Sequence, residues 1–220
     1  MTMTPTEALA AWRRTGVIAV LRAPDAVRAL RTVDALVAGG VTGIEVTYTT
    51  PDTADVIRTA LDRYGDSALI GAGTVTKPSQ AREATDAGAR FIVTPGTWPE
   101  VAQAVVATAV PAMFGAFTAS EVMTAIELGA TAVKLFPAGL GGPELLRALR
   151  GPFPDVPIVP AGGVQPDNLA TWLEAGALAV GAGGELCSTT AIAQQDWDEI
   201  GRRARAFSAA LRKAPGYMPS

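Results

Sequence analysis

Three charged side chains stand in otherwise apolar runs of this sequence. Lys134 lies in the middle of AVKLFPA, Glu45 lies within GIEVTYT, and Arg22 ends VIAVLR. An ammonium group taken out of water costs several kcal/mol unless it is paired, deprotonated or consumed in a covalent bond. A neutral lysine amine can attack a ketone and form a protonated Schiff base, which withdraws electrons from the adjacent carbon–carbon bond. We therefore predict covalent carbon–carbon chemistry at Lys134.

Lysine is rare in this chain, which otherwise uses arginine. The other two lysines are Lys77, which precedes a proline, and Lys213, near the C-terminal end. Because lysine can lose its proton and arginine cannot, a lysine at position 134 favours a nucleophile. Carbon–carbon cleavage or formation also needs a proton shuttle, and Glu45 is the available group. The alternative interpretation is a buried Lys134–Glu45 ion pair with a structural role only.

The elements that must position these residues repeat along the chain. Apolar, β-rich runs alternate with alanine- and leucine-rich helical segments that end at glycine. The starts of the runs lie roughly 20 to 26 residues apart, the length of one strand–helix unit with short loops. About eight repeats favour a closed parallel barrel over an open sheet, which more often has about five or six strands. The runs begin at Val17, Gly43, Leu69, Phe91, Pro111, Ala132, Pro157 and Leu178.

The predicted fold is an α/β fold, a (β/α)8 TIM barrel that forms a single domain over residues 1–220. A capping box from Thr4 to Glu7 predicts an extra N-terminal helix at about 5–15. A second capping box predicts the last helix at about 197–213. Residues 214–220 are predicted to form a loose tail.

Strand alternation predicts which side chains face the interior of the barrel. Along the sixth run it turns Val133 and Leu135 toward the helices and Lys134 toward the barrel axis. The same parity turns Glu45 and Arg22 inward. One lysine, one glutamate and one arginine are therefore expected to converge inside the barrel, where the strands end and the loops begin.

The bulk composition limits which classes of partner the protein is expected to bind. The chain has 220 residues, 49% of them hydrophobic, and its 18 basic and 21 acidic residues give a net charge of -3. Because no basic run matches a phosphate backbone, nucleic acid is not an expected partner. No segment has the uninterrupted apolar length of a membrane span or a signal peptide, so we expect a cytoplasmic protein without a membrane partner.

The composition also narrows the chemistry. Histidine is absent, and Cys187 is the single cysteine. An internal disulfide is therefore excluded, and the commonest acid/base residue and transition-metal ligand is missing. No metal and no cofactor are expected, since an iminium is itself the electron sink.

Glycines gather at the ends of the last two runs, as Gly162 and Gly163 and as Gly183 and Gly184. Exposed backbone N–H groups at these strand ends form the usual phosphate cradle of such barrels. The alternative is that these glycines only make tight turns. The earlier stretch GAGT lacks the third glycine and the acidic partner of a dinucleotide site, so no nicotinamide cofactor is expected.

Six segments together resemble a known family: IAVLRA, GIEVTYTTPD, IGAGTV, FIVTPG, AVKLFPA and PAGGV, in this order along nearly the whole chain. They are similar to the 2-keto-3-deoxy-6-phosphogluconate aldolases and 4-hydroxy-2-oxoglutarate aldolases. The resemblance implies a class I, Schiff-base aldolase on a TIM barrel, usually a homotrimer. Such an enzyme cleaves the sugar acid phosphate of the Entner–Doudoroff route to pyruvate and glyceraldehyde 3-phosphate, and 4-hydroxy-2-oxoglutarate is a further candidate substrate.

The resemblance also implies roles for individual residues. Lys134 matches the Schiff-base lysine and Glu45 the general acid/base. Arg22 matches the arginine that some members place at the end of the first strand for the substrate carboxylate, whereas others carry an arginine at the position of Thr49. The remaining implied substrate-binding residues are Thr74, Pro95, Phe136 and Ala161, and the implied phosphate-binding residues are Gly162, Gly163, Gly183 and Gly184.

Several positions depart from the family pattern. Ala161 stands where threonine is common and Gly184 where serine is common, and each lost hydroxyl weakens a contact by about 0.5 to 1.5 kcal/mol. Phe114 or Phe117 at the pocket mouth is expected to favour a different aldehyde or an unphosphorylated one. Trp98 is expected to pack near a helix. These departures motivate the alternative of a weakened barrel that acts as a trimeric scaffold or a binder of phosphorylated metabolites.

Overall fold

The computed structural model describes residues 3–215 and residue 217. Of the tail predicted over 214–220, residues 216 and 218–220 lie outside the described residues. Within the described part of the chain, no helix is long and apolar enough to cross a membrane.

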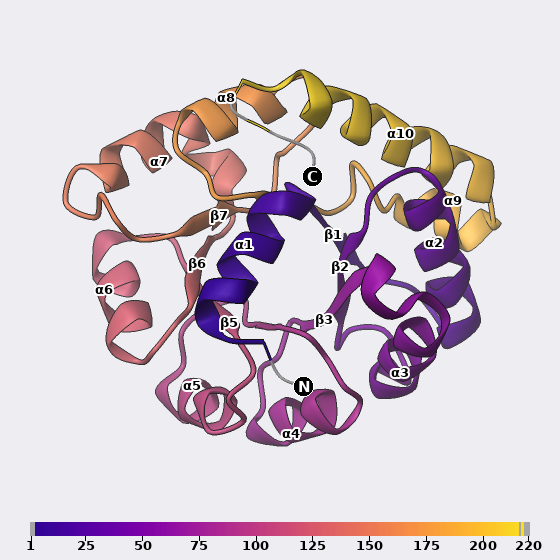
Figure 1. Cartoon of the computed structure of the whole chain (residues 1–220), viewed down its shortest axis with the longest axis horizontal. Coiled ribbons are helices and arrows are strands. Elements are labelled where there is room, and N and C mark those ends of the chain that lie inside the picture. Colours follow the sequence, from indigo (N-terminus) through magenta and orange to yellow (C-terminus); the bar gives the residue numbers. More distant parts are fainter. Residues whose placement is uncertain (1–2, 216, 218–220) are drawn as a thin grey trace.

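Eight parallel strands form one sheet in the order β7-β6-β5-β4-β3-β2-β1-β8, curled into a barrel with helices outside (Figure 1). The two end strands meet through a single pairing, Ala161 with Gly181, which closes the barrel. The predicted TIM barrel is confirmed. The strands are β1 (Val17–Leu21), β2 (Gly43–Thr47), β3 (Leu69–Gly73), β4 (Ile92–Val93), β5 (Ala112–Ala116), β6 (Ala132–Leu135), β7 (Ile158–Pro160) and β8 (Val180–Ala182).

The helices follow from apolar residues at helical spacing and from strong caps. In α2, the buried residues Ala29, Val33 and Leu36 recur every three or four positions, so one face of the helix packs on the strands. The predicted capping box at Thr4 is present and starts α1. The helices are α1 (Pro5–Thr15), α2 (Ala26–Ala38), α3 (Thr53–Tyr64), α4 (Pro78–Asp86), α5 (Pro99–Val106), α6 (Ala119–Glu127), α7 (Gly142–Arg150), α8 (Leu169–Glu174), α9 (Thr189–Gln194) and α10 (Trp197–Lys213), with 3₁₀ turns η1 (Gly65–Ser67) and η2 (Ala138–Leu140).

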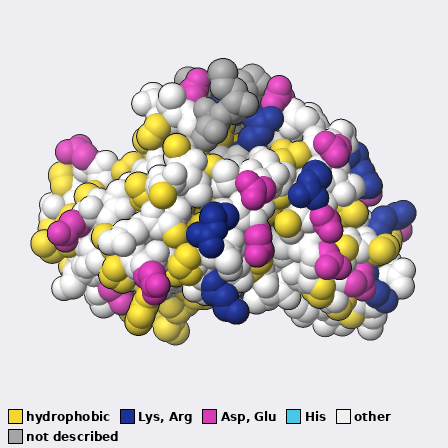
Figure 2. All heavy atoms as spheres, turned by 90° about the horizontal axis from the view of Figure 1, so that it is seen from below, with side chains coloured by type: hydrophobic (Ala, Val, Ile, Leu, Met, Phe, Trp, Pro, Cys, Tyr) yellow, Lys and Arg dark blue, Asp and Glu magenta, His cyan; other side chains and the backbone are white. Residues whose placement is uncertain are grey.

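The surface seen from the side of α4 and α5 mixes both signs of charge. Figure 2 shows acidic and basic side chains interspersed over this face, with hydrophobic side chains gathered along its lower edge. Interspersed charges give no extended field of one sign on this side of the barrel.

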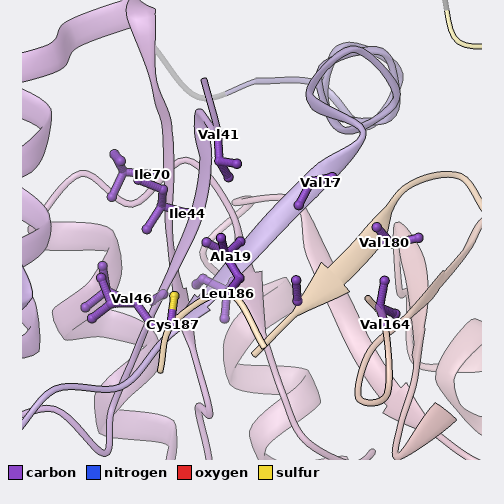
Figure 3. Packing of buried hydrophobic residues seen from close by; sticks show 14 of the residues in the cluster. Val17, Ala19, Val41, Ile44, Val46, Ile70, Val164, Val180, Leu186 and Cys187 are labelled. Carbon is purple, nitrogen blue, oxygen red and sulfur yellow. The ribbon is translucent and has the colours of Figure 1, made fainter. Parts of the chain in front are cut away.

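Two hydrophobic clusters hold the fold together. The larger one fills the space between the strands and the helices and includes Ile44, Val46, Val133 and Leu135. Part of it is seen in Figure 3, where Ile44 and Val46 lie in the same layer as Cys187. The outward parity predicted for these strands is therefore confirmed.

The smaller cluster fills the interior of the barrel near the strand starts. Ile18, Phe91 and Met113 contribute to it from three strands or the residues just before them. Helix α1 lies across this end of the barrel (Figure 1) and adds Ala8 and Trp12 to the cluster. The Trp12 and Phe91 rings meet edge to face with their centroids 6.0 Å apart. The apolar plug seals this end, which leaves the carboxyl ends of the strands for a site.

Candidate active site

Lys134 and Glu45 meet inside the barrel. The Lys134 Nζ donates to both carboxylate oxygens of Glu45, at 3.1 and 3.2 Å. The residues are only 5% and 3% exposed. Strands β2 and β6 are opposite each other in the closed sheet, so the two side chains reach across the interior. The predicted inward orientation of both residues is confirmed.

Two glycines lie in the interior beside this pair. A Cβ atom at Gly73, the last residue of β3, would lie 2.0 Å from the Glu45 Oε1. Gly115 of β5 is the register partner of Lys134, and a Cβ there would lie 2.2 Å from the Pro95 carbonyl. Most barrel interiors are layered with Val, Ile and Leu. Here Gly73 on β3 leaves space for the Glu45 side chain, and Gly115 on β5, beside Lys134, leaves space for the Pro95 backbone.

The threonines after β2 form part of the rim. The buried Thr47 Oγ1 donates to the Leu21 carbonyl at 2.9 Å, which ties β2 to the end of β1. Its hydroxyl also lies 2.7 Å from the Thr49 hydroxyl. Thr49 is exposed, so it lies at the mouth of the barrel.

Phe136 covers the lysine. The Lys134 Nζ lies 5.7 Å from the centroid of the Phe136 ring, within the range of a cation–π contact. Phe136 is partly exposed and directly follows β6. Phe136 therefore lies beside the Lys134 amine at the end of β6.

Thr74 and Pro95 follow β3 and β4 at the same end of the barrel. Thr74 has a φ of 54°, a left-handed conformation that is uncommon for a β-branched residue. Such conformations cost about 1 to 3 kcal/mol and persist where the surroundings impose them. Thr74 directly follows Gly73, which contacts Glu45, and Pro95 contacts Gly115. Thr74 therefore follows the glycine that contacts Glu45, and Pro95 contacts the glycine that is the register partner of Lys134.

Arg22 does not join the pair, and the predicted convergence of three charges inside the barrel is wrong at this residue. β1 ends at Leu21, so strand alternation no longer directs the next side chain inward, and Arg22 is exposed at the rim. Within the described residues, it forms no ion pair with an acidic side chain.

The charge of Arg22 acts on Cys187, in the loop after β8. Burial raises the pKa of the Cys187 thiol to about 12, and the nearby Arg22 opposes this shift. Because β1 pairs with β8, the end of β1 lies beside the start of this loop. Arg22 is thus an exposed cation at the rim, near the loop that follows the last strand.

The predicted phosphate glycines lie on both sides of the barrel closure. Gly162 and Gly163 have φ values of 89° and 78°, which only glycine adopts readily, so they do form a tight turn. Gly183 and Gly184 have no atom within 4 Å of the place where a Cβ would stand. Ala161, before the first glycine pair, forms the closing pairing with Gly181. The two loops are therefore neighbours, and the second presents open backbone.

Two sequence predictions about aromatic residues are wrong. Phe114 is buried in the outer cluster and Phe117 packs against it, so neither lies at the pocket mouth. For Phe114 the reason is parity, because Met113 faces the interior and its neighbour must face the helices. Phe117 lies beyond Ala116, the last residue of β5, where strand alternation no longer applies. Trp98, expected to pack, is 68% exposed just before α5.

The glycines that shape the site were not assigned any role from the sequence. Gly73 belongs to the GAGT stretch, which was considered only as a dinucleotide pattern, and Gly115 has no sequence prediction. The usable signal was positional, since both stand at inward-facing positions near the ends of strands. Among the described residues, no group of three or more Asp, Glu or Cys side chains is placed to hold a metal ion.

Comparisons with known proteins agree with this geometry. A family model described as KDPG and KHG aldolase matches residues 9–203. A 2-dehydro-3-deoxy-6-phosphogalactonate aldolase of Escherichia coli K12 is 38% identical over 198 residues, 90% of this chain and 95% of the relative. A 2-dehydro-3-deoxy-phosphogluconate aldolase of Pseudomonas aeruginosa is 39% identical over 173 residues, 78% of each chain.

A solved structure is similar over almost the same length. It is the KDPG aldolase of Legionella pneumophila with pyruvate captured as a covalent carbinolamine intermediate. Its TM-score is 0.84 at 32% identity, over 93% of this chain and 98% of that one. A carbinolamine is the adduct that forms when an amine adds to a ketone.

Proposed function

The chain belongs to the KDPG and KHG aldolase family, and from that premise we propose that it is a class I aldolase that uses Lys134 as its nucleophile. Its proposed reaction is the cleavage of 2-keto-3-deoxy-6-phosphogluconate to pyruvate and glyceraldehyde 3-phosphate. The observation that carries the proposal is the buried contact of 3.1 Å between the Lys134 amine and Glu45, at the open end of the barrel.

The first half of the proposed reaction makes the Schiff base. Glu45 accepts a proton from the Lys134 ammonium across their hydrogen bond. The neutral amine then adds to the C2 ketone and gives a carbinolamine. Glu45 returns the proton to the carbinolamine hydroxyl, which leaves as water, and a protonated iminium remains.

The second half breaks the carbon–carbon bond. Glu45, again a carboxylate, removes the proton of the C4 hydroxyl while the C3–C4 bond breaks. The bonding electrons move into the iminium to give an enamine, and the aldehyde product leaves. Glu45 then protonates C3, and water hydrolyses the pyruvate iminium and frees Lys134. Every proton lost by the substrate is thus carried by one carboxyl group.

The substrate ends have proposed partners at the mouth of the barrel. The keto acid end would lie against Phe136, beside the Lys134 amine, and against Thr74 and Pro95. The phosphate would bind the open backbone at Gly183 and Gly184, together with the neighbouring Gly162 and Gly163. Arg22 and Thr49 at the rim would bind the carboxylate, and Ala161 would line the floor between the two ends.

The same chemistry applies to related substrates. The galactonate-derived epimer and 4-hydroxy-2-oxoglutarate both carry the 2-keto and 4-hydroxyl groups that the mechanism needs. The two relatives named above differ in epimer but are 38% and 39% identical to this chain, so overall identity does not select between them. A charged, phosphorylated substrate of central metabolism supports a cytoplasmic location.

A homotrimer is the proposed assembly. Trp98 and Val106 at the two ends of α5, and Met123 and Ile126 on α6, are all exposed. α5 and α6 are consecutive around the barrel (Figure 1), and Val106 lies near Gly129, just after α6. Exposed apolar side chains on neighbouring helices are typical of a protein–protein contact. The molar mass in solution, measured by light scattering, tests the trimer.

One experiment tests the function. Pyruvate and borohydride are added to the protein, and the modified peptide is identified by mass spectrometry. We expect one reduced adduct, on the peptide that carries Lys134. Pyruvate release is then measured with the gluconate-derived, galactonate-derived and unphosphorylated keto acids. A protein without an adduct and without pyruvate release would instead fit the alternative of a scaffold or metabolite binder.

A further inference from the structure

Two threonine hydroxyls extend the pairing of β4 and β5 beyond the end of β4. β4 ends at Val93, and the Thr94 N–H still donates to the Met113 carbonyl at 3.0 Å. Beyond this point, side-chain hydroxyls instead of backbone groups make the hydrogen bonds to β5. The Thr94 Oγ1 accepts the Gly115 N–H at 3.3 Å, and the Thr97 Oγ1 donates to the Gly115 carbonyl at 2.8 Å. Both backbone polar groups of Gly115 are thus held by hydroxyls.

The hydroxyls are needed because Pro95 turns the chain away from β5. Proline has no N–H to donate to a neighbouring strand, and a regular ladder does not continue through it. A buried N–H without an acceptor costs about 1 to 3 kcal/mol. Thr94 is only 2% exposed, so no bulk water reaches this position to replace its hydroxyl. The two threonines therefore supply the acceptor and the donor that the backbone lacks.

Gly115 connects this pair of threonines to the nucleophile. On its other side it is the register partner of Lys134. On its inner side Gly115 contacts the Pro95 backbone. A Cβ atom added at Gly115 would lie 2.2 Å from the Pro95 carbonyl. A shift of Gly115 would therefore displace Pro95. It would also change the position of Gly115 against Lys134 on β6.

We propose that Thr94 and Thr97 are positioning residues for the Schiff-base step. They fix Gly115 and Pro95 against β6, so that the amine of Lys134 meets the ketone carbon in one geometry. This inference rests on the proposed aldolase function and assigns a role to two residues outside the catalytic pair. A misplacement of about 1 Å at a reacting centre costs roughly 100-fold in rate, so a small displacement is measurable.

The test compares four threonine variants, including Thr97→Val, with the wild type. Thr94→Val removes the hydroxyl at nearly constant volume, and Thr94→Ser keeps it. Thr32→Val is the matched control, because Thr32 is also buried and its hydroxyl donates to the Arg28 carbonyl at 2.8 Å within α2. For each variant we measure kcat and KM for pyruvate release, the pH profile of pyruvate trapping by borohydride, and thermal unfolding.

We expect Thr94→Val to lower kcat by roughly 10- to 100-fold and to shift the pH profile of trapping, with little change in KM. Thr94→Ser should restore both to near the wild-type values. Thr32→Val should lower the unfolding temperature while kcat and the pH profile stay unchanged. Thr97→Val removes only the donor to the Gly115 carbonyl, so it should lower kcat less than Thr94→Val. If Thr94→Val does not fold, the kcat and pH profile of Thr97→Val test whether these hydroxyls position the site.

The outcomes separate this inference from the proposed function. A folded Thr94→Val variant with wild-type kcat and pH profile would show that the hydroxyl is structural only, while the aldolase proposal stands. The same conclusion follows if Thr94→Val does not fold and Thr97→Val behaves as the wild type. A wild-type protein that traps no pyruvate would overturn the proposed function and this inference with it.

Discussion

The two ends of the barrel interior are built on opposite principles. Near the strand starts, Trp12, Phe91 and Met113 fill the interior with large apolar side chains. Near the strand ends, the interior contains a lysine and a glutamate, with Gly73 and Gly115 beside them. The first arrangement buries a large apolar area, whereas the second buries less apolar area and accommodates a charged pair. Stability and chemistry are therefore separated along the barrel axis, so changes at the two ends should have different effects.

The largest effect is expected at the nucleophile. Lys134→Met should lower pyruvate release by at least about 10⁴-fold, because no Schiff base forms. It should also destabilise the fold, since Glu45 is left buried without its partner. Rates are measured by pyruvate formation and the adduct by mass spectrometry, with Lys77→Met as the matched control at an exposed lysine. An adduct that persists in Lys134→Met would place the nucleophile elsewhere.

The opposite end should respond in stability alone. Trp12→Ala removes a fully buried indole and should cost about 3 to 5 kcal/mol in the free energy of unfolding. The kcat of the folded fraction should stay at the wild-type value, because the plug lies at the far end of the interior. Urea unfolding and an assay below the transition measure the two quantities. A large loss of kcat without a loss of stability would contradict the separation of the two ends.

The glycine layer offers a sharper test of the active end. Gly73→Ala would place a Cβ 2.0 Å from the Glu45 Oε1, so the Glu45 side chain must leave its present position beside Lys134. We expect kcat to fall by roughly 100-fold, as for a displacement of about 1 Å. The matched control is Gly201→Ala on α10, where a Cβ meets only the mobile end of Arg205. Equal kcat values for the two alanine variants would mean that the position of Glu45 does not limit the reaction.

Much of this comparison was accessible from the sequence. The eight strands, the inward parity of Lys134 and Glu45 and the N-terminal cap followed from local periodicity and capping, which need no knowledge of tertiary contacts. The strands proved shorter than the apolar runs, as in β4, where only Ile92–Val93 pairs regularly. Strand ends depend on where neighbouring chains turn away, and this is a property of the assembled barrel.

The wrong and missing predictions also arise from contacts that form only in the assembled barrel. Arg22 lies one residue beyond β1, where parity no longer applies, and Phe114 was placed at the mouth although its neighbours fix it outward. The roles of Gly73 and Gly115 depend on what lies across from them, which neither residue indicates by its own type. Contacts between segments far apart in the chain are thus the part that local patterns did not supply.

The smallest effect is expected at the proposed phosphate site. Gly184→Ser adds a hydroxyl where no atom lies within 4 Å of the added Cβ, so the side chain fits without displacement. One extra neutral hydrogen bond is worth about 0.5 to 1.5 kcal/mol, so KM for a phosphorylated substrate should fall by roughly 2- to 10-fold. KM for 4-hydroxy-2-oxoglutarate should not change, because that substrate has no phosphate to accept the bond. If both KM values fall together, the hydroxyl acts on the keto acid end, and the phosphate must bind away from β8.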